Sequence, residues 1–432
     1  MKCKNLIFVN HPKMAAKPDW LPKILGEENF QQYHAYFDTF KHNHKAHSTI
    51  AYARLGASLE RVKRHCSAQN ARGGLIPYNK EEPLTQKTEL DSLKSDNIQD
   101  YMGENEAYYK VLNHFANLYE TKYGKDIKKM IKEEFPAMGD GPLVAAFHGI
   151  IQLAYGFVAN SDVVTLEGFA FAFSQYSPFL PKDPAKLSNM SNFGKGSKDM
   201  LDVLGSIRDD KAMLKHTSEL SNDPEFERKS PGNFLDWYCM AMLKHYSDKF
   251  LDWTDEIKLP EFFDSSKEDM GQLVKLLEWL EDQATIVYVK SEFVNQFFLL
   301  HGITASWCLR QVIDMFTYKQ ALHLIRTHIT GILMVYASTS APEFPKSPED
   351  FWKGGEINQD GWNVVLKDAM EKDFEDHVPK VVQVMYEKWH ANQNSPMSHY
   401  YIAGARSALD NEYNVKPFPA HIKFPNTIRD AA

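Results

Sequence analysis

The chain has 432 residues, a formal net charge of −8, 43% hydrophobic residues and 13% aromatic residues. This composition provides for a large apolar core and excludes disordered and collagen-like classes. The acidic balance and the lack of a basic stripe argue against a phosphate-binding surface, so we expect no nucleic-acid partner.

The four cysteines form no CxxC pair. This spacing excludes a thiolate zinc site and a disulfide framework, and it predicts a reducing, cytoplasmic location. The apolar run near the N-terminus is too short for a secretory signal. No stretch approaches the roughly 20 apolar residues that cross a bilayer, so we expect no membrane partner. The sequence does not define the oligomeric state.

The first hundred residues mix turn signals with short helical patterns. Residues 1–26 contain three prolines and predict an irregular leader. Across 27–41, aromatic residues recur at helical spacing, which favours a helix. A further helix is predicted over about 47–64, with Gly56 as its weak point. Residues 68–101 are polar and rich in turn residues, so we expect a long surface loop there.

Two apolar helices follow a charged region. We expect two charged helices within 103–134, and Pro142 is placed to start an apolar helix that carries His148 in its middle. Because that helix is apolar on nearly every side, it should be buried. Glu167 is the only acid of the next apolar helix, at 163–173, and is either exposed or paired with a buried donor.

The second half of the chain reads as more helices. Residues 177–232 are rich in proline, serine and aspartate, which predicts a covering segment with short helical pieces. Residues 338–362 are predicted to form a long loop. Helices are predicted at 234–246, 270–280, 291–316, 318–336, 361–373, 376–389 and 398–410. Since a proline at position 379 fits only in a first turn, Asp373 or Asp376 should cap the helix that contains it.

No stretch shows a ladder of strands with hairpin turns, and no repeat is present. The fold class that we predict is therefore all-α, a single large helical domain with long irregular loops. It spans 27–410, between the leader at 1–26 and an extended tail at 411–432.

Known catalytic motifs are missing from the sequence. There is no glycine-rich nucleotide loop, no HExxH and no GxSxG elbow, which argues against nucleotide folds and acyl transfer. A single ExxH, Glu387 to His390, does not make a di-iron site, which needs two such motifs and two further glutamates.

What remains is a set of histidines in apolar segments. These are His44 and His47, His148, His301, and His377. Neutral imidazoles from several helices suit iron, zinc, copper or nickel. Gln152 and Glu167 are candidates to hold the second ring nitrogens of such ligands. The alternative is that each histidine is an ordinary core residue bonded to a backbone carbonyl.

Four segments together resemble the questin oxidase-like family. They are Asn43-His44-x-x-His47 with Leu55–Ser58, His148–Gly156, Phe297–His301, and His377–Lys380. Their order and spacing match from about residue 30 to residue 395. The resemblance implies a mostly helical oxygenase that cleaves polyketide aromatics such as anthraquinones by a Baeyer–Villiger-type or ring-opening reaction. Some members depend on NADPH and others on non-haem iron.

Carried over residue by residue, the resemblance implies a ligand set. It consists of His47, His148, His301 and His377, with His44 competing with His47 and with Lys380 beside them. An ammonium is repelled by a metal, so Lys380 joins only when deprotonated or converted by CO2 to a carbamate. Otherwise it faces solvent at a helix start. Two positions depart from the family pattern: Ser48 replaces a second histidine, and Gln383 replaces an arginine.

We therefore expect a non-haem Fe(II) oxygenase that binds a small aromatic substrate and O2, with Lys380, Gln152 and Glu167 in catalytic roles. The reaction is insertion of oxygen with cleavage of a C–C bond next to a carbonyl. A metal-free, NADPH-dependent Baeyer–Villiger-type oxidase and a non-catalytic helical scaffold are the alternatives.

Other residues near the histidines have less specific roles. Seven aromatic residues are expected mostly in the core, with some able to stack on a substrate: Phe147, Tyr155, Phe169, Phe171, Phe297, Phe298 and Trp307. His323, Arg326 and His328 are expected to line or rim a pocket rather than bind metal.

Overall fold

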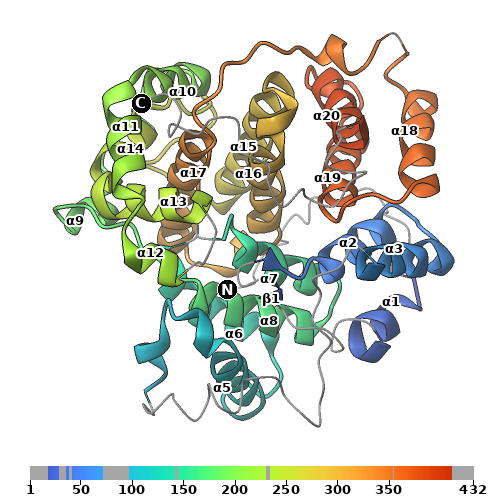
Figure 1. Ribbon diagram of the computed structural model, residues 1–432, viewed down its shortest axis with the longest axis horizontal. Helices are drawn as coiled ribbons and strands as arrows, with labels where there is room; N and C mark the ends of the chain where they lie inside the picture. Colours follow the sequence, from blue (N-terminus) through green and yellow to red (C-terminus); the bar gives the residue numbers. More distant parts are fainter. Residues whose placement is uncertain are drawn as a thin grey trace.

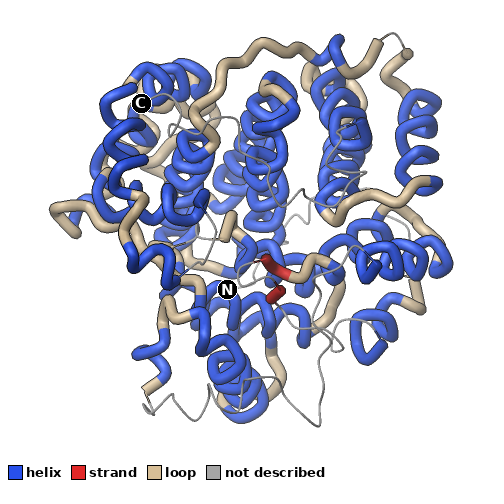
Figure 2. The backbone as a smooth tube through the Cα atoms, in the orientation of Figure 1, coloured by secondary structure: helices blue, strands red, loops and turns tan. Residues whose placement is uncertain are grey.

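Helices form nearly all of the regular structure, as Figures 1 and 2 show. The structure is a computed structural model, and it describes residues 18–28, 36–37, 41–71, 97–141, 145–229, 234–353 and 355–410. The predicted all-α class is confirmed. Among the described residues, none of the helices combines the length and the apolar character that a membrane span requires.

The element bounds follow in chain order. The helices are α1 (Leu21–Lys23), α2 (Lys45–Arg54), α3 (Leu59–Ala71), α5 (Tyr108–Thr121), α6 (Ile127–Glu134), α7 (His148–Val158), α8 (Asp162–Ser174), α9 (Ala185–Ser188), α10 (Met200–Asp209), α11 (Lys211–Leu220), α12 (Pro224–Lys229), α13 (Phe234–His245), α14 (Ser247–Glu256), α15 (Met270–Lys290), α16 (Phe293–Val312), α17 (Tyr318–Ser338), α18 (Gln359–Glu371), α19 (His377–Ala391) and α20 (Ser398–Asp410). Two short strands, β1 (Tyr36–Phe37) and β2 (Lys41–His42), pair antiparallel.

The N-terminal region differs from the sequence prediction. The helix predicted over 27–41 is not formed at residues 36–37 and 41, because Tyr36–Phe37 pairs with Lys41–His42 as a strand. The last part of the expected leader contains α1, whose Leu21 is buried in the core. The leader before residue 18, most of the expected loop at 68–101, and the tail after residue 410 lie outside the described residues.

The predicted helix over 47–64 is two helices, α2 and α3. Gly56 lies between them with a φ of +82°, a left-handed conformation that only glycine adopts without strain. The chain therefore turns at this point, and α3 packs beside α2 (Figure 1).

The apolar helix α7 begins at His148, so this histidine is its first residue rather than its middle one. Pro142, where the sequence predicted the helix to start, lies outside the described residues. The three residues that precede α7, Ala145, Ala146 and Phe147, all have φ between +50° and +64°. Such strain in non-glycine residues is concentrated at functional sites in proteins.

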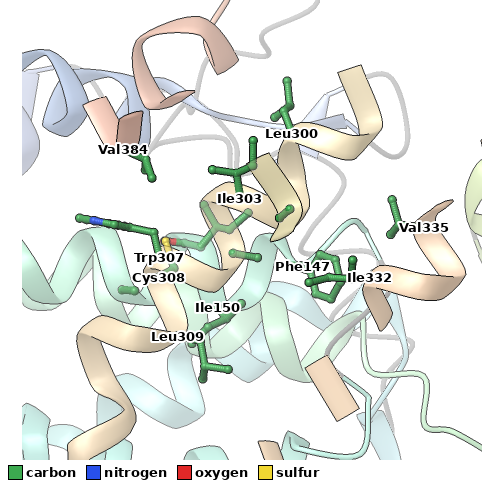
Figure 3. Packing of buried hydrophobic residues seen from close by; sticks show 14 of the residues in the cluster. Phe147, Ile150, Leu300, Ile303, Trp307, Cys308, Leu309, Ile332, Val335 and Val384 are labelled. Carbon is green, nitrogen blue, oxygen red and sulfur yellow. The ribbon is translucent and has the colours of Figure 1, made fainter. Parts of the chain in front are cut away.

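Helix α16 is at the centre of the apolar core. Figure 3 shows its side chains, among them Ile303 and Trp307, packed against Phe147, Ile332 and Val384 from other segments. Four helices form a closed set of contacts: α16 contacts α7 and α19, and α2 contacts the same two helices. Long-range packing therefore brings together segments that are hundreds of residues apart in the sequence.

Candidate metal centre

Histidines from these four segments meet inside the protein. His44 precedes α2, His148 begins α7, His301 lies in α16, and His377 begins α19. The Nε2 atoms of His44 and His148 are 2.6 Å apart, and those of His301 and His377 are 3.1 Å apart. Ligand nitrogens of His44, His148 and His377 all lie within 4.8 Å of one another. His44, which was expected to compete with His47, is thus a member of this group.

Two of these rings are held from behind by backbone carbonyls. His148 Nδ1 donates to the carbonyl oxygen of Ala145, and His301 Nδ1 donates to that of Phe298 at 3.1 Å. In both cases the carbonyl lies three residues earlier in the chain. Each ring therefore carries its proton on Nδ1 and turns the lone pair of Nε2 toward the other histidines.

His377 is held by a carboxylate. Its Nδ1 lies 2.7 and 2.8 Å from the two oxygens of Glu375, and the backbone N–H of His377 also donates to Glu375. A carboxylate behind an imidazole is the common arrangement for a histidine that binds a metal. Glu375 was not predicted from the sequence, although its position two residues before His377 was a usable signal.

His47 is oriented by the two residues that were predicted to act behind the ligands. Gln152 Nε2 donates to Glu167 at 2.7 Å, so the amide oxygen of Gln152 faces His47 and accepts from its Nε2. The proton of His47 is therefore on Nε2 and its lone pair on Nδ1. The sequence left Glu167 either exposed or paired with a buried donor, and the structure shows the second. Burial raises its pKa to about 7.

His42 completes the cluster and was not among the predicted ligands. Its ring stacks on His47 with centroids 5.2 Å apart and is buried, 3% exposed. The sequence signal was its spacing, two residues before His44, but a ligand role was not considered for a residue in a small basic patch. The short strand β2 carries it inward.

Lys380 is fully buried, which rules out the alternative that it faces solvent. Its Nζ has no hydrogen-bond partner in the described part of the chain. Burial lowers its pKa to about 8, although Glu375 and Asp376 act in the opposite direction. A buried amine without a partner is costly as an ammonium, so the neutral form is accessible near neutral pH.

All six imidazoles of the cluster are electrically neutral near neutral pH. Burial, and then the charges of their neighbours, holds the pKa of each well below its usual range; the residues are His42, His44, His47, His148, His301 and His377. Neutral imidazole is the form that binds a metal, because the lone pair is then free.

The facing nitrogens of His301 and His377 test whether these residues fit a metal. Both outer Nδ1 atoms are occupied as donors, so both Nε2 atoms present lone pairs to each other at 3.1 Å. Two lone pairs at this separation repel unless a cation lies between or beside them. The donor set therefore fits a metal ion that prefers nitrogen ligands.

The two departures from the family pattern have anchoring roles. Ser48 donates to Asp376 at 2.6 Å, and His65 contacts both of them at 3.0 Å. Asp376 stands at the N-cap of α19, but its side chain caps nothing and binds α2 and α3 instead. Gln383 accepts from the hydroxyl of Tyr155 at 2.7 Å.

Residues expected to line a pocket hold other parts of the fold together. Arg326 makes a two-pronged ion pair with Asp255, at 2.9 and 2.8 Å. His328 is buried and contacts Ser306 at 3.0 Å, and His323 pairs with Asp140. Neither histidine belongs to the convergent groups. Glu387 of the ExxH motif is bound by Arg54 and Trp307 and is no ligand here.

The aromatic residues near the cluster divide into two sets. Phe147, Tyr155, Phe169, Phe171 and Trp307 are fully buried core residues. Phe297 and Phe298 are half-buried. The ring of Phe297 contacts those of His377 and His301, with centroids 4.8 and 5.9 Å away.

The fold and the site together define a helical protein with a buried, histidine-rich centre that fits a metal. The sequence model of the questin oxidase-like family matches residues 41–385, a range that includes every histidine of the cluster. The chain belongs to the questin oxidase-like family, and membership indicates an enzyme of the oxidase or oxygenase type. No curated protein matches the chain.

Proposed function

We propose that this protein is a non-haem iron oxygenase that inserts oxygen next to a carbonyl of a polycyclic aromatic substrate, with cleavage of a C–C bond. The single observation that carries the proposal is the pair of facing Nε2 lone pairs on His301 and His377, 3.1 Å apart. A buried pair of donors without a proton between them is stabilised by a cation. The family supplies the reaction class and the substrate class.

Four imidazoles would hold the iron: those of His44, His148, His301 and His377. His44 is preferred to His47 in this set because its Nε2 faces His148, whereas the Nε2 of His47 is bound to Gln152. When bound, Fe(II) supplies the activation of O2 that an organic side chain does not provide.

Lys380 would contribute an anionic ligand. As the neutral amine, its Nζ forms a bond to the carbon of CO2 and releases a proton, which gives a carbamate with a negative oxygen. Its complete burial and the lack of a partner for Nζ within the described residues support this role. A carbamate would also offset part of the charge of a bound dication in a site with four neutral imidazoles.

Phe297 and the buried walls would position the substrate. The half-buried ring of Phe297 contacts two of the proposed ligands, so a flat aromatic molecule stacked on it would lie beside the metal. The surrounding apolar core excludes water, which favours oxygen transfer to the substrate over its loss to solvent.

The test is an anaerobic titration with Fe(II) followed by O2 uptake in the presence of an anthraquinone. We expect about one iron per chain at this site and uptake that depends on both iron and substrate. His301→Ala and His377→Ala should lose both properties, whereas the exposed His399→Ala should keep them. Turnover by iron-free protein with NADPH would instead support the metal-free oxidase. Full iron binding and full turnover in both histidine variants would overturn the proposal.

A further inference from the structure

The histidine cluster contains more imidazoles than one ion uses. Besides the group around His148 and His377, ligand nitrogens of His42, His44 and His47 also lie within 4.8 Å of one another. The proposed iron site leaves His42 and His47 without a role. We propose that His42, His44 and His47 form a second metal site, which takes a divalent ion that prefers imidazole ligands, such as Zn(II).

Two ring nitrogens of this group lack hydrogen-bond partners among the described residues. They are Nδ1 of His42 and Nδ1 of His47, and both are buried. The two side chains are 3% and 0% exposed, so water does not satisfy them from outside. Native proteins leave few buried polar atoms unsatisfied, and two in stacked neighbouring rings indicate a ligand.

The position of the proton on His47 also supports a bound metal. The chain of hydrogen bonds from Glu167 through Gln152 fixes the proton of His47 on Nε2. The unsatisfied Nδ1 therefore presents a lone pair, as a metal requires. Glu375 fixes the proton of His377 directly, whereas Glu167 fixes the proton of His47 through Gln152.

His44 is shared between the two groups. Its Nε2 faces His148, and an imidazole has a second nitrogen on the other side of its ring. An ion on each nitrogen would require the ring to release its remaining proton to solvent. Three imidazoles leave a fourth position of a tetrahedral ion open, which is the pattern of catalytic rather than structural zinc sites.

The experiment counts ions in metal-free protein that is titrated with Zn(II) alone and desalted before elemental analysis. We expect two ions per chain for the wild type, one for His42→Ala and one for the double variant His301→Ala/His377→Ala, which leaves the first group only two imidazoles. His42→Gln, which keeps a polar side chain of similar length, should also bind one, and His399→Ala should bind two. Circular dichroism establishes that each variant is folded.

Co(II) alone supplies a spectroscopic readout that does not depend on activity. In the spectrum of His42→Ala, the visible bands that belong to the second site should be absent. Gln152→Leu should weaken the second ion by roughly 10–100-fold, because it releases the proton of His47 from Nε2.

Two outcomes would overturn the second site: a wild type that binds one ion, or a His42→Ala variant that still binds two. If His301→Ala/His377→Ala loses an ion while His42→Ala and His42→Gln do not, the second site is wrong and the iron site stands. If His301→Ala/His377→Ala binds two ions, the iron site is wrong instead.

Discussion

Which nitrogen of each imidazole carries the proton decides what the centre can bind. His301 and His377 are fixed with Nδ1–H by Phe298 and Glu375, and His47 is fixed in the opposite way by Gln152. The sequence identified these three histidines and Gln152. It did not give the proton positions, because they depend on side-chain contacts between segments that fold together only in the complete molecule.

The free-energy cost of burying Lys380 can be tested in the metal-free protein. In CO2-free buffer, Lys380→Met should raise the free energy of unfolding by roughly 1–4 kcal/mol, because it removes a buried, unpaired ammonium. The pKa of Lys380 is lowered to about 8, so the unfolded chain holds its proton to a higher pH than the folded protein. The gain should therefore be full below pH 8 and decline toward about pH 10.

Urea unfolding at several pH values measures this gain. Lys388→Met is the matched control, because Lys388 lies on the same helix but is paired with Asp282 at 2.8 Å and should lose stability when replaced. A Lys380→Met protein that is less stable than the wild type at pH 7 would show that the amine has a favourable partner.

Glu167 has the opposite kind of dependence. Burial raises its pKa to about 7, so its ionisation is unfavourable in the folded state. The wild type should lose stability relative to Glu167→Gln as the pH rises from about 4.3 to 7, and the difference should stay constant above that. Chemical unfolding of metal-free protein measures it, with the exposed Glu371→Gln as control. A difference that does not change with pH would contradict the shift.

At the scale of elements, the pair α7 and α8 positions Gln152 against Glu167. The two helices approach closely at glycines. A Cβ on Gly149 would lie 2.6 Å from the Cβ of Ala172, and one on Gly168 would lie 2.5 Å from the Cα of Leu153. Larger residues there would push the helices apart and separate the amide from the carboxylate.

Gly168→Ala should therefore destabilise the protein by roughly 1–3 kcal/mol or more, since the added methyl group meets backbone. Gly205→Ala in α10 is the control, because its Cβ would meet nothing closer than a side-chain nitrogen of Arg208 at 3.8 Å. The control should gain about 0.5–1 kcal/mol from the better helix propensity of alanine. Thermal unfolding compares the two, and equal effects would show that α7 and α8 can separate without cost.

The helices were predictable because apolar periodicity is a local property, and most of those from α5 onward lie close to where it placed them. The strand pair β1–β2 was not predictable, because two-residue strands leave no periodic pattern in the sequence. His42 lies on β2, so no helical pattern indicated that it is buried.

At the scale of the whole molecule, the histidine cluster joins segments from both ends of the chain. His44 and His377, for example, lie 333 positions apart. The four motifs in order indicated the family and its ligand segments. Sequence alone did not decide between His44 and His47 as candidate iron ligands, because both lie at the start of one helix and their distances to His148 depend on the packing of that helix.

Iron should stabilise the folded protein as a whole, because the unfolded chain has no assembled site. At a free concentration 100 times the Kd, the gain is about 2.7 kcal/mol. We expect the melting temperature to rise on anaerobic addition of Fe(II), to fall again with a chelator, and to be unaffected by either in His377→Ala. An equal rise in His377→Ala would place the stabilising iron elsewhere.

The most direct test of the iron site is anomalous diffraction at the iron edge, from crystals grown with Fe(II) in the absence of O2. A strong peak is expected at roughly 2.1 Å from the Nε2 atoms of His148, His301 and His377. If iron binds in solution and the peak lies away from these three atoms, the histidine cluster is not the iron site.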